Sequence, residues 1–105
     1  MREGEILRQF GTDMDGAVIN IFGNIKTPEH FVEINEKIDA TQQKFNTSTL
    51  HIHDSFIMTS NMIGQLLKKI NQDGQNIRVV VHNEDLYVLL SNLNLVGVFK
   101  VQKMF

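Results

Sequence analysis

The sequence predicts a single α/β domain: a mixed β-sheet of four or five strands with about three helices, mainly on one face of the sheet. The length of 105 residues fits one domain with its own core. Short β-branched runs alternate with longer segments whose apolar residues recur at helical spacing, and capping or turn residues stand between them. The expected order is a hairpin followed by three helix–strand units. Right-handed crossovers would then give parallel pairing after the hairpin and leave the second face of the sheet partly open.

The N-terminal hairpin is expected from two strand candidates and the turn residues between them. Residues 5–10 form the first strand candidate, and residues 17–22 are a β-branched run typical of a buried strand. Residues 11–16 are rich in Gly and Asp, and the dipeptide Asp15-Gly16 is a hairpin signal.

The first helix is expected over residues 28–44, after a loop at residues 23–26. Thr27 is a suitable N-cap, and Pro28 suits the first helical position because an N–H there would have no helical partner. A polar turn then leads into a strand at residues 50–53. The apolar face of the helix is expected to consist of Phe31, Ile34, Ile38 and Phe45.

A second amphipathic helix follows that strand and is central to the functional prediction. Thr59, Ser60 and Asn61 are three consecutive cap-forming residues, of which Ser60 is expected to be the N-cap. Gly74 is expected to end the helix in the left-handed conformation. The free N–H groups and the positive dipole end make the place of Ser60 favourable for an anion such as a phosphoryl group. The apolar side consists of Met62, Ile63, Leu66, Leu67 and Ile70.

The last third of the chain repeats the strand–helix pattern. Residues 77–82 read as a strand, Asn83 as the cap of a helix, and Asn94 as its left-handed end. Residues 96–101 are expected to form the last strand. The apolar face of this helix is expected to consist of Leu86, Leu89, Leu90 and Leu93.

Composition and charge exclude several functional classes. A net charge of −2 offers no attraction to nucleic acid or to an anionic membrane, and the absence of cysteine excludes disulfides and thiolate sites. No apolar run approaches the ~20 residues that span a bilayer, and the N-terminal residues do not resemble a signal peptide. The glycines form no phosphate-binding loop, so no cofactor is expected. We therefore expect a cytoplasmic protein without nucleic-acid or membrane partners.

The stretch Phe56-Ile57-Met58-Thr59-Ser60-Asn61-Met62, placed between a strand and a helix, resembles the F-I-D-S-S-G-L pattern of the STAS domain, the family of anti-sigma factor antagonists. Residues 23–28 resemble the family's glycine loop and capped helix, and Asn94-Leu95 with Phe99 resembles its late pattern. With the element order, the resemblance covers roughly residues 17–101. Met58 and Asn61 stand where the family has Asp and Gly, and residues 102–105 stand where it has a last helix.

The resemblance implies a non-enzymatic regulatory protein. Family members bind an anti-sigma factor that is also a serine kinase, and so release a sigma factor. The kinase phosphorylates the second hydroxyl residue of the turn, which is Ser60 here, with Thr59 as the alternative. The added charge would repel an acidic partner. The residues expected to contact the partner, exposed methionines among them, are Asn24, Thr27, Met58, Thr59, Ser60, Asn61 and Met62.

Two other interpretations concern assembly. The chain could be an unphosphorylated STAS-like subunit of a larger complex, such as one for lipid transport or stress sensing. It could also form a homodimer, because apolar residues gather near its end at Val98, Val101 and Phe105.

A further alternative, from a different class, is a metal-binding protein. His51 and His53 are two positions apart on a predicted strand, so their imidazoles share one face. Asp54 could add an oxygen ligand or orient a histidine. His30 and His82 are additional candidate ligands.

Overall fold

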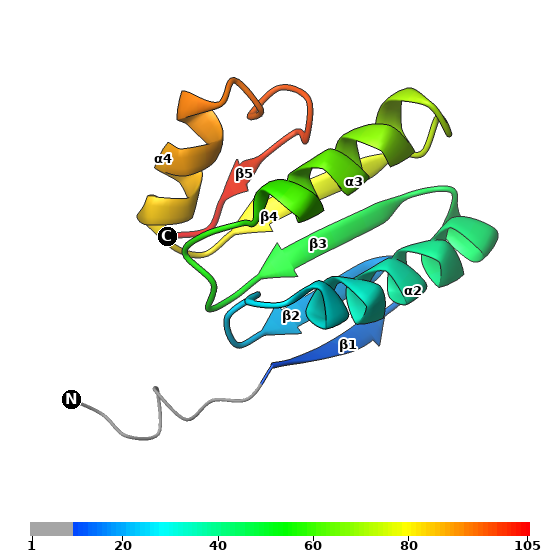
Figure 1. Cartoon of the computed structure of the whole chain (residues 1–105). Helices are drawn as coiled ribbons and strands as arrows, with labels where there is room; N and C mark the ends of the chain where they lie inside the picture. Colours follow the sequence, from blue (N-terminus) through cyan, green and yellow to red (C-terminus); the bar gives the residue numbers. More distant parts are fainter. Residues whose placement is uncertain (1–9) are drawn as a thin grey trace.

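A five-stranded mixed sheet with three helices on one face makes up residues 10–105, which are the residues described by the structure, a computed structural model (Figure 1). This confirms the predicted fold class. The strands lie in the sheet in chain order: β1 (Gly11–Asp15), β2 (Val18–Phe22), β3 (Ser48–Ile52), β4 (Ile77–Val81) and β5 (Gln102–Lys103). The helices of this part of the chain are α2 (Pro28–Phe45), α3 (Ser60–Asn71) and α4 (Glu84–Asn92).

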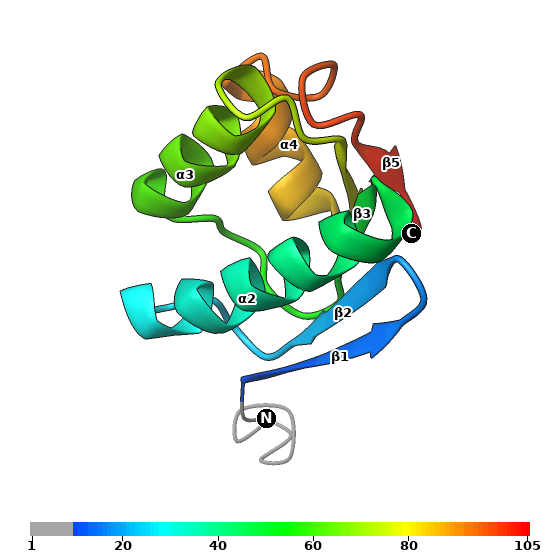
Figure 2. The ribbon, with the colours of Figure 1, turned by 90° about the vertical axis from the view of Figure 1, so that its right-hand side faces the viewer.

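The pairing directions explain why the helices share a face. β1 and β2 are antiparallel, whereas β2–β3, β3–β4 and β4–β5 are all parallel. Each new strand is added on the same side of the previous one, so each right-handed crossover places its helix over the same face. Figure 2 shows α2, α3 and α4 together on one side of the strands. The other face of the sheet carries no helix of the described chain, as expected.

The hairpin differs from the prediction in register. Gly11–Asp15 is itself a strand, paired from Gly11↔Phe22 to Asp15↔Val18, so assigning residues 11–15 to the turn was wrong, whereas Gly16 does lie in it. The turn consists of Gly16, with φ 65°, and Ala17. Thr12 holds the strand to α2, because its N and Oγ1 donate to Glu33 Oε2 at 3.0 and 2.7 Å. The strand predicted at residues 5–10 falls, apart from its last residue, outside the described part of the chain.

The first helix, α2, begins at the residue that the sequence predicted. Thr27 is the N-cap, its side chain accepts a hydrogen bond from His30 N, and Pro28 takes the first helical position. Asn46 ends the helix with φ 60°. Phe31, Ile34 and Ile38 are buried, but Phe45 is 45% exposed, so its assignment to the apolar face was wrong. Phe45 is the last residue of α2, next to the C-cap Asn46.

The core lies between the helices and the covered face of the sheet. Strand alternation selects the residues that enter it: in β3, Ser48, Leu50 and Ile52 are buried while Thr49 and His51 are only half-buried. α3 contributes Met62 and Leu66. The other fully buried apolar side chains include Ile19, Ile21, Ile25, Ile34, Ile38, Val79, Val81, Leu86, Leu90 and Phe99.

The chain after α4 also differs from the prediction. Residues 96–100 form turns, and the strand is only Gln102–Lys103, so the strand predicted at residues 96–101 was wrong. Three backbone bonds close the turns: Phe99 N donates to Leu95 O, Lys100 N to Gly97 O, and Val101 N to Val96 O. These turns let Leu95 and Phe99 reach the core. Asn94 has φ 60°, as expected for a residue that follows the end of a helix.

Within residues 10–105, no helix combines the length and the apolar content that crossing a bilayer requires.

Candidate functional site

The loop between β3 and α3, residues 53–59, begins at the carboxyl end of β3. It is hydrogen-bonded to the loop that follows β2. Asp54 Oδ2 accepts a hydrogen bond from Gly23 N at 2.8 Å. Ser55 is buried; its Oγ accepts from Ile25 N at 3.2 Å and donates to Ile57 O at 2.8 Å. The conformation of the loop is therefore fixed by polar contacts that reach across 30 or 31 positions of sequence.

The same loop is held from the β4 side by Asn83. Asn83 Nδ2 donates to Ser55 O at 2.8 Å, and Asn83 Oδ1 accepts from Leu86 N at 2.8 Å as the N-cap of α4. The loops that follow β2, β3 and β4 therefore form one hydrogen-bonded unit at the carboxyl ends of the parallel strands.

The start of α3 is close to the prediction, with the roles of two hydroxyls exchanged. Thr59 is the N-cap, and its Oγ1 accepts from Met62 N at 3.2 Å. Ser60 is the first helical residue and is exposed. Assigning the cap to Ser60 was wrong, and the consequence is that its hydroxyl lies on the surface beside the helix N-terminus. Asn61 is exposed next to it.

The methionines of this turn do not lie on the surface. Met62 is 0% exposed, as its place on the apolar side of the helix predicts, and Met58 is 5% exposed, so the prediction that the two offer an adaptable contact surface was wrong. Their place is taken by Phe56 and Ile57, which are 51% and 49% exposed. Three apolar residues, Phe56, Ile57 and Met58, stand between the end of β3 and the cap of α3, and the sequence alone does not indicate which of them is buried.

The neighbouring loop and α3 extend this surface. Thr27 is exposed at the start of α2, and Asn24 is half-buried, with an Oδ1 that has no hydrogen-bond partner within the described chain. Along α3, an open hollow of about 340 Å³ runs beside Ser60. Its lining consists of Ser60, Asn61, Gly64, Gln65 and Lys68.

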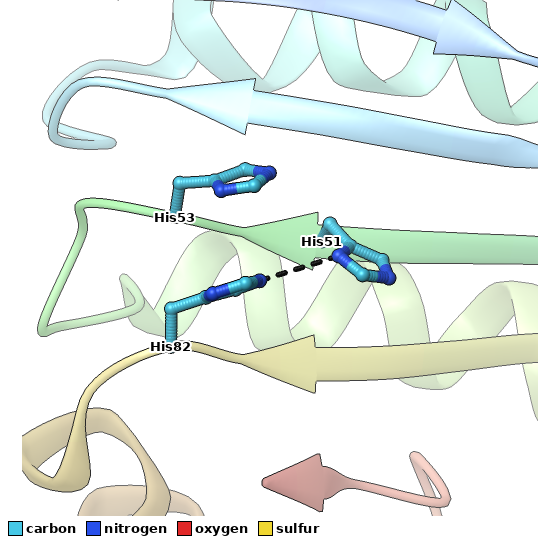
Figure 3. A group of neighbouring side chains, drawn as sticks. All are labelled: His51, His53 and His82. Carbon is cyan, nitrogen blue, oxygen red and sulfur yellow. Dashed lines mark hydrogen bonds between the residues drawn. The ribbon is translucent and has the colours of Figure 1, made fainter. Parts of the chain in front are cut away.

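A second candidate site lies on the uncovered face of the sheet, where three imidazoles converge (Figure 3). His51 is in β3, His53 follows the end of β3, and His82 follows the end of β4. One ligand nitrogen from each ring lies within 4.8 Å of the other two. All three side chains are half-buried, so the cluster is accessible from solvent.

Hydrogen bonds and ring contacts hold the three imidazoles in place. His51 Nδ1 and His82 Nε2 share a hydrogen bond of 3.2 Å, and His53 Nε2 bonds to Asn20 Oδ1 at 2.9 Å. His53 lies in a stack, with ring centroids 4.3 Å from His82 and 4.7 Å from Phe22. Burial, and secondly electrostatic repulsion from His82, hold the pKa of His51 below its ordinary value.

The structure brings together only part of the predicted metal-binding set. His51 and His53 share a face, as strand alternation predicted, and His82 joins them. Among residues 10–105, Asp54 is not in the cluster and instead binds the backbone of Gly23. His30 is also elsewhere: its Nδ1 accepts from Lys26 N at 3.0 Å, and its ring stacks on Phe10 with centroids 4.1 Å apart.

Comparison with protein-family models, with curated proteins and with solved structures found no match to this chain. The functional proposals below therefore rest on the geometry of these two sites and on the resemblance of the turn sequence.

Proposed function

We propose that this chain is a non-enzymatic, STAS-like regulatory protein that binds a protein partner through a docking face made of Phe56, Ile57, Ser60 and Asn61. The observation that carries the proposal is the exposed Ser60 hydroxyl at the first residue of α3, next to an exposed apolar pair. The partner class that the turn sequence implies is an anti-sigma factor with serine-kinase activity. Thr27 and Asn24, on the adjoining loop, extend the contact surface.

The docking face has the physical properties of a binding surface. Phe56 is an aromatic side chain half-exposed to water, and phenylalanine is among the aromatic residues that are enriched in protein–protein interfaces. Asp54 and Ser55 fix the backbone that carries it through hydrogen bonds to Gly23 and Ile25. Because this backbone is already ordered in the free protein, little conformational entropy is lost on binding.

Ser60 is the better phosphorylation site of the two adjacent hydroxyls. The Thr59 hydroxyl is engaged as the N-cap and its side chain is half-buried, whereas Ser60 is exposed. A phosphoryl group adds about −1.5 to −2 charges, which the N-terminus of a helix tolerates in the free protein. The same charge beside Phe56 and Ile57 would have to be desolvated in an interface, so phosphorylation would release the partner.

The modification is tested by incubating the protein with ATP and the anti-sigma factor kinase of its host, and measuring intact mass. One phosphoryl group is expected on the wild type and none on Ser60→Ala. Ser91→Ala is the matched control, since Ser91 is an exposed serine of another helix and its variant should be modified as the wild type is. An unmodified wild type, or a fully modified Ser60→Ala, would remove the switch.

The docking face is tested by measuring the affinity for the same partner. Phe56→Ser and Ser60→Asp are each expected to weaken binding by about tenfold or more, by loss of an anchor and by added charge. Val88→Ser is the control, because Val88 is 45% exposed on α4. Equal binding by Phe56→Ser and wild type would contradict the docking face. If Phe56→Ser loses binding but Ser60 is never modified, the chain is an unphosphorylated subunit.

A further inference from the structure

The three histidines of the uncovered face come together through strand geometry. His51 and His53 are two positions apart on one extended segment, so their side chains leave the sheet on the same side. In the parallel register β3 pairs with β4 up to Ile52↔Val81, and His82 N continues it by donating to Ile52 O at 3.3 Å. His82 is therefore set beside His53, on the face that no helix of the described chain covers.

Two nitrogen atoms of this cluster are spaced as ligands of one ion would be, and a nitrogen of the third ring lies close to both. Zinc–imidazole bonds are about 2.0–2.1 Å long, which in tetrahedral geometry places two ligand nitrogens about 3.3–3.4 Å apart. His51 Nδ1 and His82 Nε2 are already 3.2 Å apart. The three ligand atoms lie within 4.8 Å of one another, so no pair needs to close by more than about 1.5 Å. The ring that has to move is that of His53, which would turn out of its stack on His82.

The hydrogen bonds also suit a metal site. One proton lies between His51 Nδ1 and His82 Nε2 in their hydrogen bond. A metal ion would displace this proton and bind the lone pairs of both nitrogens. His53 Nε2 is hydrogen-bonded to Asn20 Oδ1 at 2.9 Å, and this bond fixes the orientation of the ring. A side-chain oxygen that orients a histidine in this way is a usual support of metal-binding imidazoles.

We infer that His51, His53 and His82 form a binding site for a divalent transition-metal ion, with Asn20 as the residue that orients His53. The ligand set is three neutral imidazoles, which suits Zn²⁺, Ni²⁺ or Cu²⁺ and not Mg²⁺ or Ca²⁺. Three protein ligands leave a fourth position of a tetrahedral ion for water or for a ligand from another molecule. The site does not depend on the docking face or on modification of Ser60.

Zinc titration tests the inference directly. Protein without a histidine tag, stripped with a chelator and then freed of it, is titrated with Zn²⁺ by calorimetry, and one ion per chain is expected. His51→Ala and His82→Ala should each weaken binding by about 100-fold or more, and Asn20→Ala by about tenfold. Mg²⁺ at the same concentration should give no binding.

The matched control is His30→Ala, which removes the one histidine that lies outside the cluster. This variant should bind Zn²⁺ as tightly as the wild type. Absence of one-to-one binding, or equal loss of affinity in His30→Ala and His51→Ala, would overturn the inference. Circular dichroism of each variant verifies that it is folded.

A second measurement on the wild type avoids substitutions altogether. Imidazole resonances in nuclear magnetic resonance spectra should move for His51, His53 and His82 when one equivalent of Zn²⁺ is added, while those of His30 stay in place. Movement of His30, or of only one ring of the cluster, would contradict a three-histidine site. The phosphorylation of Ser60 is measured in separate samples, so the two proposals can fail independently.

Discussion

The side chain of Asn83 donates from Nδ2 to the backbone carbonyl of Ser55 at 2.8 Å, although the two residues are 28 positions apart. The same side chain caps α4 through Oδ1. Asn83 therefore joins the start of α4 to the loop that carries the docking face, and both halves of its amide group are in use.

Asn83→Ala is expected to lower the free energy of unfolding by about 2 kcal/mol, since it removes a helix cap and leaves the Ser55 carbonyl without its donor. Asn83→Asp keeps a capping oxygen but loses the donor, so its loss should be smaller. Urea unfolding of the three proteins measures both steps. Equal stability of Asn83→Asp and wild type would show that the contact with Ser55 contributes nothing.

Thr59→Ala should cost about 1 kcal/mol of stability, because Thr59 Oγ1 accepts from Met62 N at 3.2 Å as the cap of α3. Ser60→Ala should change stability by less than about 0.5 kcal/mol, as for other exposed positions. Chemical denaturation of the two variants compares them directly. The reverse order of effects would identify Ser60 as the cap.

Leu66→Ala is expected to destabilise the fold by about 2–5 kcal/mol, because Leu66 is fully buried where α3 faces the sheet and its truncation leaves a cavity. Val32→Ala is the control: it also shortens an aliphatic side chain in a helix, but Val32 is 55% exposed. Its effect should stay within about 0.5 kcal/mol. Thermal and urea unfolding both measure the difference, and similar losses for the two variants would contradict the packing.

In metal-free protein, His51 should make stability depend on pH on the acid side of neutrality. Its pKa is lowered by burial and by His82, so between the folded pKa and about 6.5 the unfolded chain binds more protons than the folded one. Stability should fall as pH decreases from about 6.5 through the folded pKa, and the contribution should be constant above that range. Urea unfolding between about pH 5 and 8, compared with His51→Gln, isolates it. Parallel pH profiles for the two proteins would contradict this origin.

Much of the fold could be predicted because its determinants are local. Thr27 with Pro28, and Asn83 with Leu86, identify two helix starts within four residues of sequence. The edge strands could not be placed in this way. β1 has the sequence Gly-Thr-Asp-Met-Asp, which has the composition of a turn, and it is held as a strand by pairing with β2 and by the bonds of Thr12 to Glu33. β5 is only two residues long.

In the candidate sites too, the features set by local sequence could be predicted, and those set by contacts between distant segments could not. Alternation along one strand predicted that His51 and His53 share a face. The position of His82 beside them depends on the register between β3 and β4, which the sequence does not reveal. Asp54 is adjacent to His53 in sequence, yet it turns to the amide of Gly23, a contact 31 positions away. Whether Met58 or Phe56 is exposed likewise depends on how the loop is fastened, which no local pattern contains.

The backbone N–H groups of Gly23 and Ile25 donate hydrogen bonds to the side chains of Asp54 and Ser55, so these bonds tie the loop after β2 to the loop after β3. Substituting Asp54 or Ser55 therefore removes a bond that orders both loops, and it also affects residues that the substituted side chain does not contact. Variants placed one in each loop should therefore show a coupling free energy of about 0.5–3 kcal/mol in a double-mutant cycle. Evolution of this surface would then favour paired changes over single ones.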